Sequence, residues 1–406
     1  MNERLKASLK KIQPLNAAWS FLRTAKCNYY LSRWEKNKPD NRHISVAFLA
    51  QLPEIWDKQD TVFEKMLADS RFDPFLVAVP SYDIVKGEIG AYGYELEYFE
   101  KKYPAERVLK AKQEDGSWLD LKACGFDYVF YQRPYESYLP RQYDTAHVIQ
   151  YSRTAYIPYY YQYLNFPLYE ATGFFNNLYL FFASSEADKR QSRIMTKRHV
   201  VSVGYPVLER VKPAETAQKK FTFLWTPRWI DDEQTGGSNF MKYKDLIVKW
   251  KAERDDIRLI IRPHPMTFAN AIKEGKMSPS EVRDYKNSLI ERHITLDSNI
   301  FAEDTFAEMD ALITDTSSII ISAFVTGKPI IYCSNPQLDF TEDYQKIIGA
   351  SYQVSDWENL LRTAEMLAHG DDPMKERRLD VISCLNVPEN SVDSILETLA
   401  RGGCAD

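Results

Sequence analysis

The sequence lacks the features that mark secreted, zinc-binding and membrane-spanning proteins. Its 406 residues include five cysteines, which are widely spaced and form no CxxC pair. This pattern indicates neither a disulfide framework nor a zinc site, and it favours a reducing, cytoplasmic compartment. No run of 18 uncharged apolar residues occurs, and the N-terminus has no continuous apolar stretch. We therefore expect neither a spanning helix nor a signal peptide.

Common catalytic motifs and overall positive charge are also missing. The sequence contains no HExxH, P-loop GKS/T, GxSxG or GxGxxG motif, which removes the commonest metalloprotease, kinase-like, serine hydrolase and dinucleotide signatures. The formal net charge is -5 and the pI is about 5.8. Such a chain offers no general field to neutralise a phosphate backbone, so we expect no nucleic-acid partner.

Positive charge is concentrated at the N-terminus. Residues 1–39 hold nine Lys and Arg against two Glu, a local charge of +7 (9 minus 2). Within residues 1–38 the apolar side chains recur at roughly helical spacing, with a break expected at Pro14. One interpretation is a helix on an anionic membrane surface, which would place the protein peripherally on the inner face of the plasma membrane. The other is a helix packed on the protein with a solvated basic face.

The rest of the chain alternates strands with helices. In the first half we expect a strand, a helix and a strand at His43–Ala50, Trp56–Ser70 and Phe72–Pro80. The other expected strands there are 128–131, 148–150, 178–183 and 200–203; the helices are 92–102 and 186–195, and 105–125 is read as surface loop. This alternation indicates a parallel sheet covered on both faces.

The alternation restarts after a polar, proline-containing segment at Lys212–Lys220, which we interpret as a linker. Because 406 residues exceed the usual size of one core, two domains are expected. The predicted division is a basic amphipathic helical segment at 1–40, an N-terminal domain at 41–208, a C-terminal domain at 220–385, and a final helix and tail at 386–406. Two doubly wound domains would face each other across a central cleft.

One stretch near the C-terminal third has the form strand, turn, helix, strand. We expect a buried strand at 311–314, a helix at 319–326 that stops at Gly327, and a second strand at 329–332. The turn between strand and helix reads Asp315-Thr316-Ser317-Ser318. Hydroxyls beside the N–H groups of a helix start suit a phosphate group. The alternative is that Asp315 only caps the helix.

Two further strand ends should fall on the same edge of that sheet. One is followed by Thr226-Pro227-Arg228 and the glycine pair 236–237, and the other by Arg262-Pro263-His264-Pro265. Two arginines, a histidine and a hydroxyl-rich helix start supply the donors that a diphosphate requires. Each part also has a structural explanation: the prolines make a rigid corner, and Arg228 has acidic neighbours at 231–233.

The segment from Tyr156 to Phe182 is unusually aromatic, with 12 of its 27 residues being Tyr or Phe. Core and domain-interface packing is the ordinary explanation for such a cluster. The alternative is that some rings line a cleft for a carbohydrate or lipid-linked acceptor.

Taken together, these motifs resemble the CDP-glycerol glycerophosphotransferase family, the teichoic acid primases and polymerases. The resemblance rests on Trp225–Arg228, Arg262–Pro265 and Leu312–Ser318 with Gly327–Pro329, and also on the N-terminal segments 131–135 and 156–159. It implies a GT-B fold of two Rossmann-like domains, with the acceptor bound by the first and the donor nucleotide by the second. It further implies that Arg262 and His264 meet the donor phosphates, aided by Thr226, Arg228, Gly237, Asp315, Thr316, Ser317 and Ser318.

The sequence departs from the family at the expected catalytic base. Polymerases of this family carry a His-Gly motif in the N-terminal domain, whereas residues 150–156 here contain no histidine. Either another residue activates the acceptor, such as Glu136, Asp144 or His147, or the transfer is a different one. With Glu136 as the working choice, the predicted catalytic residues are His264, Arg262 and Glu136.

Three hypotheses for function follow. The first is transfer of a glycerol-phosphate or similar polyol-phosphate unit from a CDP-activated donor to a hydroxyl of a polymer or lipid-linked glycan. The second is a GT-B glycosyltransferase that uses a nucleotide-sugar donor in capsule, lipopolysaccharide or wall-polymer synthesis. The third is a catalytically silent binding module of such a complex. The first hypothesis requires no cofactor and no metal, since arginine, histidine and a helix dipole can neutralise a leaving nucleotide.

Overall fold

The structure is a computed structural model of the 406-residue chain. It describes residues 22–403 except for 23–24, 27, 31, 34–35, 37–42, 84–85, 166–171, 196–198, 212–219, 230–236, 334–337 and 386–389. Most of the basic N-terminal segment predicted at 1–40 therefore lies outside the described residues. Within the described part of the chain, no helix combines the length and the apolar character needed to cross a membrane.

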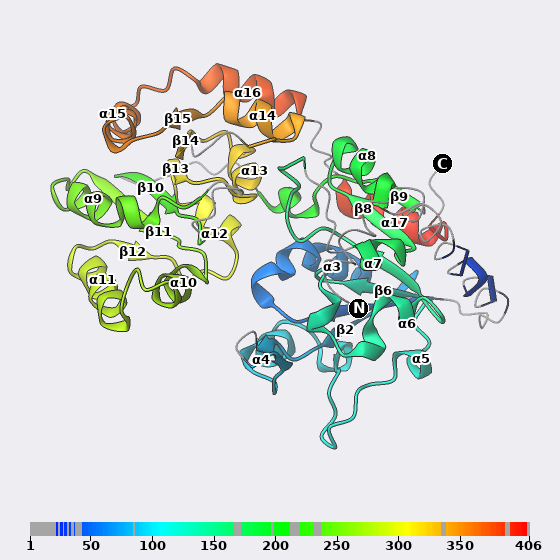
Figure 1. The fold of residues 1–406 in the computed structure, drawn as a ribbon. Helices are drawn as coiled ribbons and strands as arrows, with labels where there is room; N and C mark the ends of the chain where they lie inside the picture. The colour runs from blue at the N-terminus through cyan, green and yellow to red at the C-terminus, as the bar shows by residue number, and fades with distance from the viewer. Residues whose placement is uncertain are drawn as a thin grey trace, which may run out of the picture. The chain divides into compact units, whose positions relative to one another are not determined.

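The chain divides into two compact units (Figure 1). The first comprises Met1–Tyr160, Pro167–Pro206 and Pro388–Asp406, and the second comprises Tyr161–Phe166 and Val207–Val387. The main division thus falls between Pro206 and Val207, a few residues before the linker that composition suggested. Each unit has its own parallel sheet and its own buried core.

The first unit is built on a seven-stranded parallel sheet in the order β5-β2-β1-β6-β7-β8-β9. Its strands are β1 (Ile44–Ala50), β2 (Phe72–Ala78), β5 (Val108–Lys110), β6 (Tyr128–Tyr131), β7 (Arg153–Tyr156), β8 (Leu180–Ala183) and β9 (His199–Ser202). A small hairpin of β3 (Tyr82–Asp83) and β4 (Glu88–Ile89) follows β2. The central strand β1 is buried on both faces, because Val46 and Phe48 enter one core cluster while Ala47 and Leu49 enter the other.

Helices cover this sheet. They are η1 (Pro53–Lys58), α3 (Asp60–Ala68), α4 (Tyr94–Lys102), η2 (Ala105–Arg107), α5 (Leu121–Cys124), η3 (Glu136–Tyr138), η4 (Arg141–Tyr143), α6 (Thr145–Val148), α7 (Thr172–Asn176) and α8 (Glu186–Met195). The short helix η6 (Pro206–Arg210) begins at the division and belongs to the second unit from Val207 onward. The C-terminal helix α17 (Ser391–Ala400) returns to this unit, packs on α3 and appears in red among its blue and green elements in Figure 1. Val392 and Leu396 are buried in the same core cluster as Phe63.

Two expectations for the first unit were wrong. Residues 148–150 end a helix and enter a turn, and the strand begins at Arg153. The segment 105–125 is not merely loop, because it supplies the edge strand β5 and helix α5. Both elements are only three or four residues long, and such lengths give too few apolar positions for a periodic pattern.

The second unit has a six-stranded parallel sheet in the order β12-β11-β10-β13-β14-β15. Its strands are β10 (Phe221–Thr226), β11 (Ile257–Ile261), β12 (Thr295–Leu296), β13 (Ala311–Thr314), β14 (Ile330–Cys333) and β15 (Tyr352–Val354). Its helices are α9 (Phe240–Ala252), α10 (Thr267–Lys273), α11 (Pro279–Glu291), α12 (Ala302–Phe306), α13 (Ile319–Phe324), α14 (Glu342–Gly349), α15 (Trp357–Ala368) and α16 (Lys375–Cys384). The pattern alone gave no sign of α10, α14, β15 or α16.

The strand, turn, helix, strand unit predicted in the second half is present as β13, α13 and β14. Gly327 ends the helical segment with a φ of +77°, a left-handed conformation that glycine adopts without strain. Helix α13 is two residues shorter than expected, because the backbone N–H groups of Thr326 and Gly327 donate to carbonyls three residues back, as in a turn. With two parallel sheets, each covered by helices, the expected class of two Rossmann-like domains is confirmed.

Candidate functional site

The predicted donor residues follow three adjacent strands of the second sheet. Strand β10 lies between β11 and β13, and the chain builds outward from β10 in both directions. The boundary between β10 and β13 is therefore the topological switch point of this sheet. Ligands of open parallel sheets bind at the carboxyl ends of the strands flanking such a point. Arg228 follows β10 there, and the turn at 315–318 follows β13.

Asp315 fastens these two strand ends together. Its carboxylate is fully buried and accepts hydrogen bonds from the Arg228 backbone N–H at 2.9 Å, the Asn239 backbone N–H at 3.1 Å and the Asn239 Nδ2 at 2.7 Å. Burial is the main effect on this group and raises its pKa. The side chain thus faces inward, toward the backbone of the β10 loop, and organises the site from beneath.

Arg228 connects the same two loops from the other direction. Its Nη1 donates to the Thr316 carbonyl at 3.0 Å, and its own carbonyl accepts from the Ser238 hydroxyl at 2.6 Å. The guanidinium is half-buried above the 315–318 turn. A fixed guanidinium next to a helix start suits the recognition of a phosphate group.

Tyrosines from later elements hold the 315–318 turn by hydrogen bonds. The Thr316 hydroxyl lies 2.6 Å from the Tyr332 hydroxyl, and the Ser317 carbonyl accepts from the Tyr344 hydroxyl at 3.0 Å. Thr316 is buried, whereas Ser317 and Ser318 are half-buried. Of the three predicted hydroxyls, the two serines thus keep the greater exposure.

Thr226 and Gly237 shape the backbone around this point. The buried Thr226 hydroxyl donates to the Thr314 hydroxyl at 2.7 Å, which ties the last residues of β10 and β13. Gly237 has a φ of +61°, so its backbone takes a left-handed turn just before α9. The intervening residues 230–236, including Gly236, lie outside the described part of the chain.

The Arg262 side chain makes its hydrogen bonds to a loop of its own domain. Its Nη1 donates to Asp297 at 2.7 Å and to the Asn299 carbonyl at 2.8 Å, and its Nη2 donates to the Ile300 carbonyl at 2.9 Å. The guanidinium therefore clamps the loop between β12 and α12. Its catalytic role stays a prediction, and this geometry favours a positioning role.

His264 presents a hydrogen-bond donor at the same edge. Its ring stacks on Trp229 with centroids 5.5 Å apart, and its Nδ1 accepts from the Met266 backbone N–H at 3.1 Å. In the neutral ring the proton must then sit on Nε2. Desolvation, followed by the charges of Arg228 and Arg262, lowers the pKa of His264 to about 4. The side chain is exposed, so solvent screens part of this effect, but every contribution favours the neutral ring.

Four supporting residues of this site were not found from the sequence: Asn239, Asp297, Tyr332 and Tyr344. Each acts by a hydrogen bond to a residue between 16 and 76 positions away. The only available signal was Asn239, which follows the glycine pair and directly precedes a helix. The other three are ordinary members of strands, helices or loops.

The catalytic candidates of the first unit lie on the loops that follow β6. One Glu136 oxygen accepts from both the backbone N–H, at 2.6 Å, and the hydroxyl of Thr145 at the start of α6. The Glu136 carboxylate therefore stabilises the start of α6. The neighbouring Asp144 carboxylate makes no cap of its own, and burial together with the charge of Glu136 raises the pKa of Asp144 to about 6. A general base that works near neutral pH needs a pKa in this region, and Asp144 meets that requirement.

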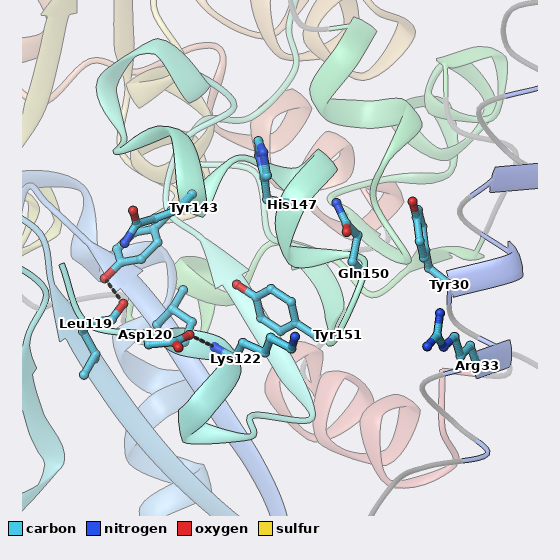
Figure 2. Close-up of a pocket in the computed structure, with 11 residues that line it drawn as sticks. Tyr30, Arg33, Leu119, Asp120, Lys122, Tyr143, His147, Gln150 and Tyr151 are labelled. Atoms are coloured by element: carbon cyan, nitrogen blue, oxygen red, sulfur yellow. Dashed lines mark hydrogen bonds between the residues drawn. The ribbon is translucent and has the colours of Figure 1, made fainter.

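His147 lines a pocket of about 740 Å³ in the first unit (Figure 2). Its Nδ1 is buried and meets no hydrogen-bond partner within the described ranges. Figure 2 shows Lys122, Gln150 and Tyr151 around the pocket, with Tyr30 and Arg33 of the N-terminal segment along one side. These two residues are the part of the basic segment that the structure connects with a cavity.

The aromatic segment beginning at Tyr156 separates into two groups. Tyr156 is buried and packs edge-on against Phe174 and Phe175 in the core. Tyr159 and Tyr160 are half-buried at the edge of the same unit. The core explanation therefore holds for the first group, while Tyr159 and Tyr160 retain accessible surface.

Comparison with known proteins places this site in context. Residues 190–357 match the family described as CDP-Glycerol:Poly(glycerophosphate) glycerophosphotransferase. No curated protein sequence matched significantly. This family segment contains Arg228, Arg262, His264 and the 315–318 turn, so the C-terminal motifs fall inside it, whereas the segments 131–135 and 156–159 lie outside it.

Solved structures show the same fold at low sequence identity. The wall teichoic acid polymerase TagF, in a structure with CDPG, has a TM-score of 0.56 and 13% identity, over 96% of this chain and 98% of that one. The S. aureus MnaA–UDP co-structure has a TM-score of 0.57 and 13% identity, over 89% and 98%. The UDP-GlcNAc 2-epimerase from Neisseria meningitidis bound to UDP-GlcNAc has a TM-score of 0.56 and 11% identity, over 88% and 100%.

These likenesses agree with the two parallel sheets and confirm the expected GT-B class. The family match over residues 190–357 bears out the resemblance and the expectation of a transferase. Across residues 190–357, the chain carries a domain of the CDP-glycerol:poly(glycerophosphate) glycerophosphotransferase family.

Proposed function

We propose that this protein transfers a glycerol-phosphate or similar polyol-phosphate unit from a CDP-activated donor to a hydroxyl of a cell-surface polymer or lipid-linked glycan. One observation carries the proposal: Arg228 and the 315–318 turn meet at the switch point of a sheet whose residues match a glycerophosphotransferase family, and His264 follows the adjacent strand β11. The donor diphosphate is bound at this edge of the second unit, and the first unit binds the acceptor.

The reaction is a substitution at the β-phosphorus of the donor. The acceptor oxygen forms a bond to phosphorus, the bond from phosphorus to the CMP oxygen breaks, and a base takes the acceptor proton. The neutral His264 donates from Nε2 and Arg228 supplies positive charge, so both can stabilise the charge that develops on the phosphate oxygens. Ser317 and Ser318 add neutral donors at the start of α13.

A thermal-shift panel tests the donor. CDP-glycerol, CDP-ribitol, CMP, UDP-sugars and GDP-sugars are compared, and the cytidine compounds are expected to raise Tm most. CMP release from CDP-glycerol in the presence of an acceptor then tests turnover. His264→Ala is expected to lower kcat about 100-fold, the usual effect of losing one transition-state donor. The matched control is His369→Ala, at an exposed histidine outside the site.

A nucleotide-sugar transferase is the second candidate function. It is favoured by the structural likeness to proteins solved with UDP and UDP-GlcNAc, and by the absence of histidine from residues 150–156. Product analysis separates the two, because one yields a phosphodiester-linked polyol and the other a glycosidic bond. A silent binding module would show no turnover with any donor and no effect of His264→Ala.

A further inference from the structure

The first sheet has a switch point of its own, and an arginine lies there. From β1 the chain adds β2 and β5 on one side, and then β6 to β9 on the other, so the switch point falls between β1 and β6. Gln51 directly follows β1, and Arg133 lies two residues beyond β6. In the second unit the corresponding strand ends, those of β10 and β13, carry Arg228 and the 315–318 turn.

Arg133 is held by an amide whose orientation is fixed. Its Nη2 donates to Gln51 Oε1 at 2.8 Å. The Gln51 amide nitrogen donates to the Pro80 carbonyl at 3.1 Å and to the Tyr138 carbonyl at 2.8 Å, so its oxygen must face the arginine. The Gln51 backbone N–H in turn donates to Oε1 of Gln132, which directly follows the neighbouring strand β6, at 2.9 Å. The guanidinium is thereby preorganised by its surroundings.

Arg133 makes no ion pair within the described part of the chain: the Glu54 carboxylate favours its charge without pairing with it, and its Nε is buried without a hydrogen-bond partner. Burial is the main effect on the group and lowers the pKa of Arg133. An arginine placed only for structure is usually paired, because an uncompensated buried charge is costly. A bound anion would supply the missing partner.

Tyrosine rings surround this guanidinium. It lies over the Tyr138 ring at 5.0 Å, and Tyr138 stacks on Tyr82 with centroids 4.6 Å apart. Tyr135 is 40% exposed, and its hydroxyl lies 2.8 Å from that of Tyr159. Rings with hydroxyl edges provide apolar contact for carbon chains together with hydrogen bonds for their hydroxyls. Such surroundings fit a hydroxylated carbon chain attached to an anion.

We propose that Arg133, with Tyr135, Tyr138 and Tyr159, forms a binding site for the phosphate of a polyol phosphate ester. Its role as the acceptor site rests on the proposed function, whereas its phosphate binding does not depend on turnover. The shared chemistry is a phosphate ester on a short polyol, either the monoester of a free molecule or the diester inside a polymer.

Titration of the full-length protein tests the site directly. The probes are sn-glycerol 3-phosphate as monoester, bis(glycerol) phosphate as diester, and glycerol as the uncharged control, measured calorimetrically in the presence of saturating CMP. We expect at least one ester to bind and glycerol not to bind. The ester that binds more tightly shows whether the natural ligand is a free monoester or a diester within a polymer. Arg133→Met should weaken ester binding about tenfold or more, and Arg133→Lys should weaken it less. Arg141→Gln, at an exposed arginine of the same connection, should bind as the parent does.

Activity measurements separate this inference from the proposed function. In Arg133→Lys the KM for a phosphate-bearing acceptor should rise, with kcat and the Tm shift from CDP-glycerol unchanged. Should Arg133→Met fail to fold, Tyr138→Leu serves as the second variant and should also weaken ester binding. The inference is overturned if the esters bind no better than glycerol, or bind equally well to the Arg133 variants. A protein that binds the esters through Arg133 but turns over no CDP-activated donor would instead refute the proposed function.

Discussion

Asp315 and Arg228 join the two strand ends of the candidate donor site through a buried hydrogen bond. The bond runs from the Arg228 backbone N–H to the Asp315 carboxylate at 2.9 Å, across neighbouring strands β10 and β13. Because the Arg228 guanidinium reaches back to the Thr316 carbonyl, each loop holds the other. The position of Arg228 thus depends on a buried carboxylate that faces the backbone of the β10 loop.

Asp315→Ala should destabilise the second unit strongly. The substitution leaves the N–H groups of Arg228 and Asn239 and the Asn239 amide without their acceptor in a buried position. We expect the free energy of unfolding to fall by about 2 to 4 kcal/mol, measured by urea denaturation. Asp245→Ala, at an exposed helix position, is the control and should change it by less than about 0.5 kcal/mol. Equal effects of the two substitutions would contradict this account.

The protonation of His264 should affect stability on the acidic side. Above a pH of about 6.5 the ring is neutral in both the folded and the unfolded chain. As the pH falls from there to about 4, the unfolded chain gains a proton that the folded protein does not, so His264 lowers stability. Below about 4 both states carry the proton, and the loss stays constant.

His264→Gln should therefore lose less stability than the parent between pH 7 and pH 4. The measurement is Tm by calorimetry at several pH values, with His369→Gln as the control at an exposed position. A bound phosphate would favour the protonated ring, so saturating CMP should reduce the difference between parent and variant. Parallel curves for the parent and His264→Gln would show that the ring has no lowered pKa.

The sequence predicted the elements of the donor site better than the directions of its side chains. The carboxyl ends of strands β10, β11 and β13 were expected within one residue, because each is a buried apolar run followed by polar residues. The inward direction of Asp315 was not foreseen, since it is set by Asn239, 76 residues earlier. Likewise, Arg262 was predicted to bind the donor phosphates, but in the structure it donates to the backbone carbonyls of residues 299 and 300. A sequence motif does not reveal such contacts, because every residue has a backbone carbonyl.

Short elements and the acceptor side were the least predictable. Strands β5 and β15 have three residues each, too few for a period to be recognised. The segment 131–135 was noted only for its resemblance to a family. The surroundings of its arginine became apparent once the fold brought Gln51 and Tyr138 to Arg133.

Arg262 and Asp297 should behave as one unit. Their side chains are 2.7 Å apart and mostly buried, and Asp297 also accepts from the Thr305 hydroxyl at 2.6 Å. A double-mutant cycle with Arg262→Gln and Asp297→Asn should give a coupling energy of about 1 to 3 kcal/mol in urea denaturation. Both variants should lower kcat/KM by similar factors, because each releases the loop at 297–300. The more exposed pair Arg258 and Glu308 provides the control cycle.

A different result would indicate that Arg262 contacts the donor directly. If Arg262 contacted the donor phosphates directly, Arg262→Gln would lower kcat/KM far more than Asp297→Asn, and the stability coupling would not account for the difference. Comparison of the two kcat/KM values at equal Tm loss therefore decides between positioning and catalysis.

The pH dependence of turnover should identify the carboxylate that accepts the acceptor proton. A base must be ionised, so with Asp144 as the base kcat/KM should rise with pH through about 6 and level off above it. Asp144→Asn should remove this limb and lower the plateau about 100-fold or more. Glu136→Gln should keep most of the activity but move the inflection to lower pH, because the negative charge of Glu136 helps to raise the pKa of Asp144. Loss of activity in Glu136→Gln with an unchanged Tm, alongside full activity in Asp144→Asn, would assign the base to Glu136 instead.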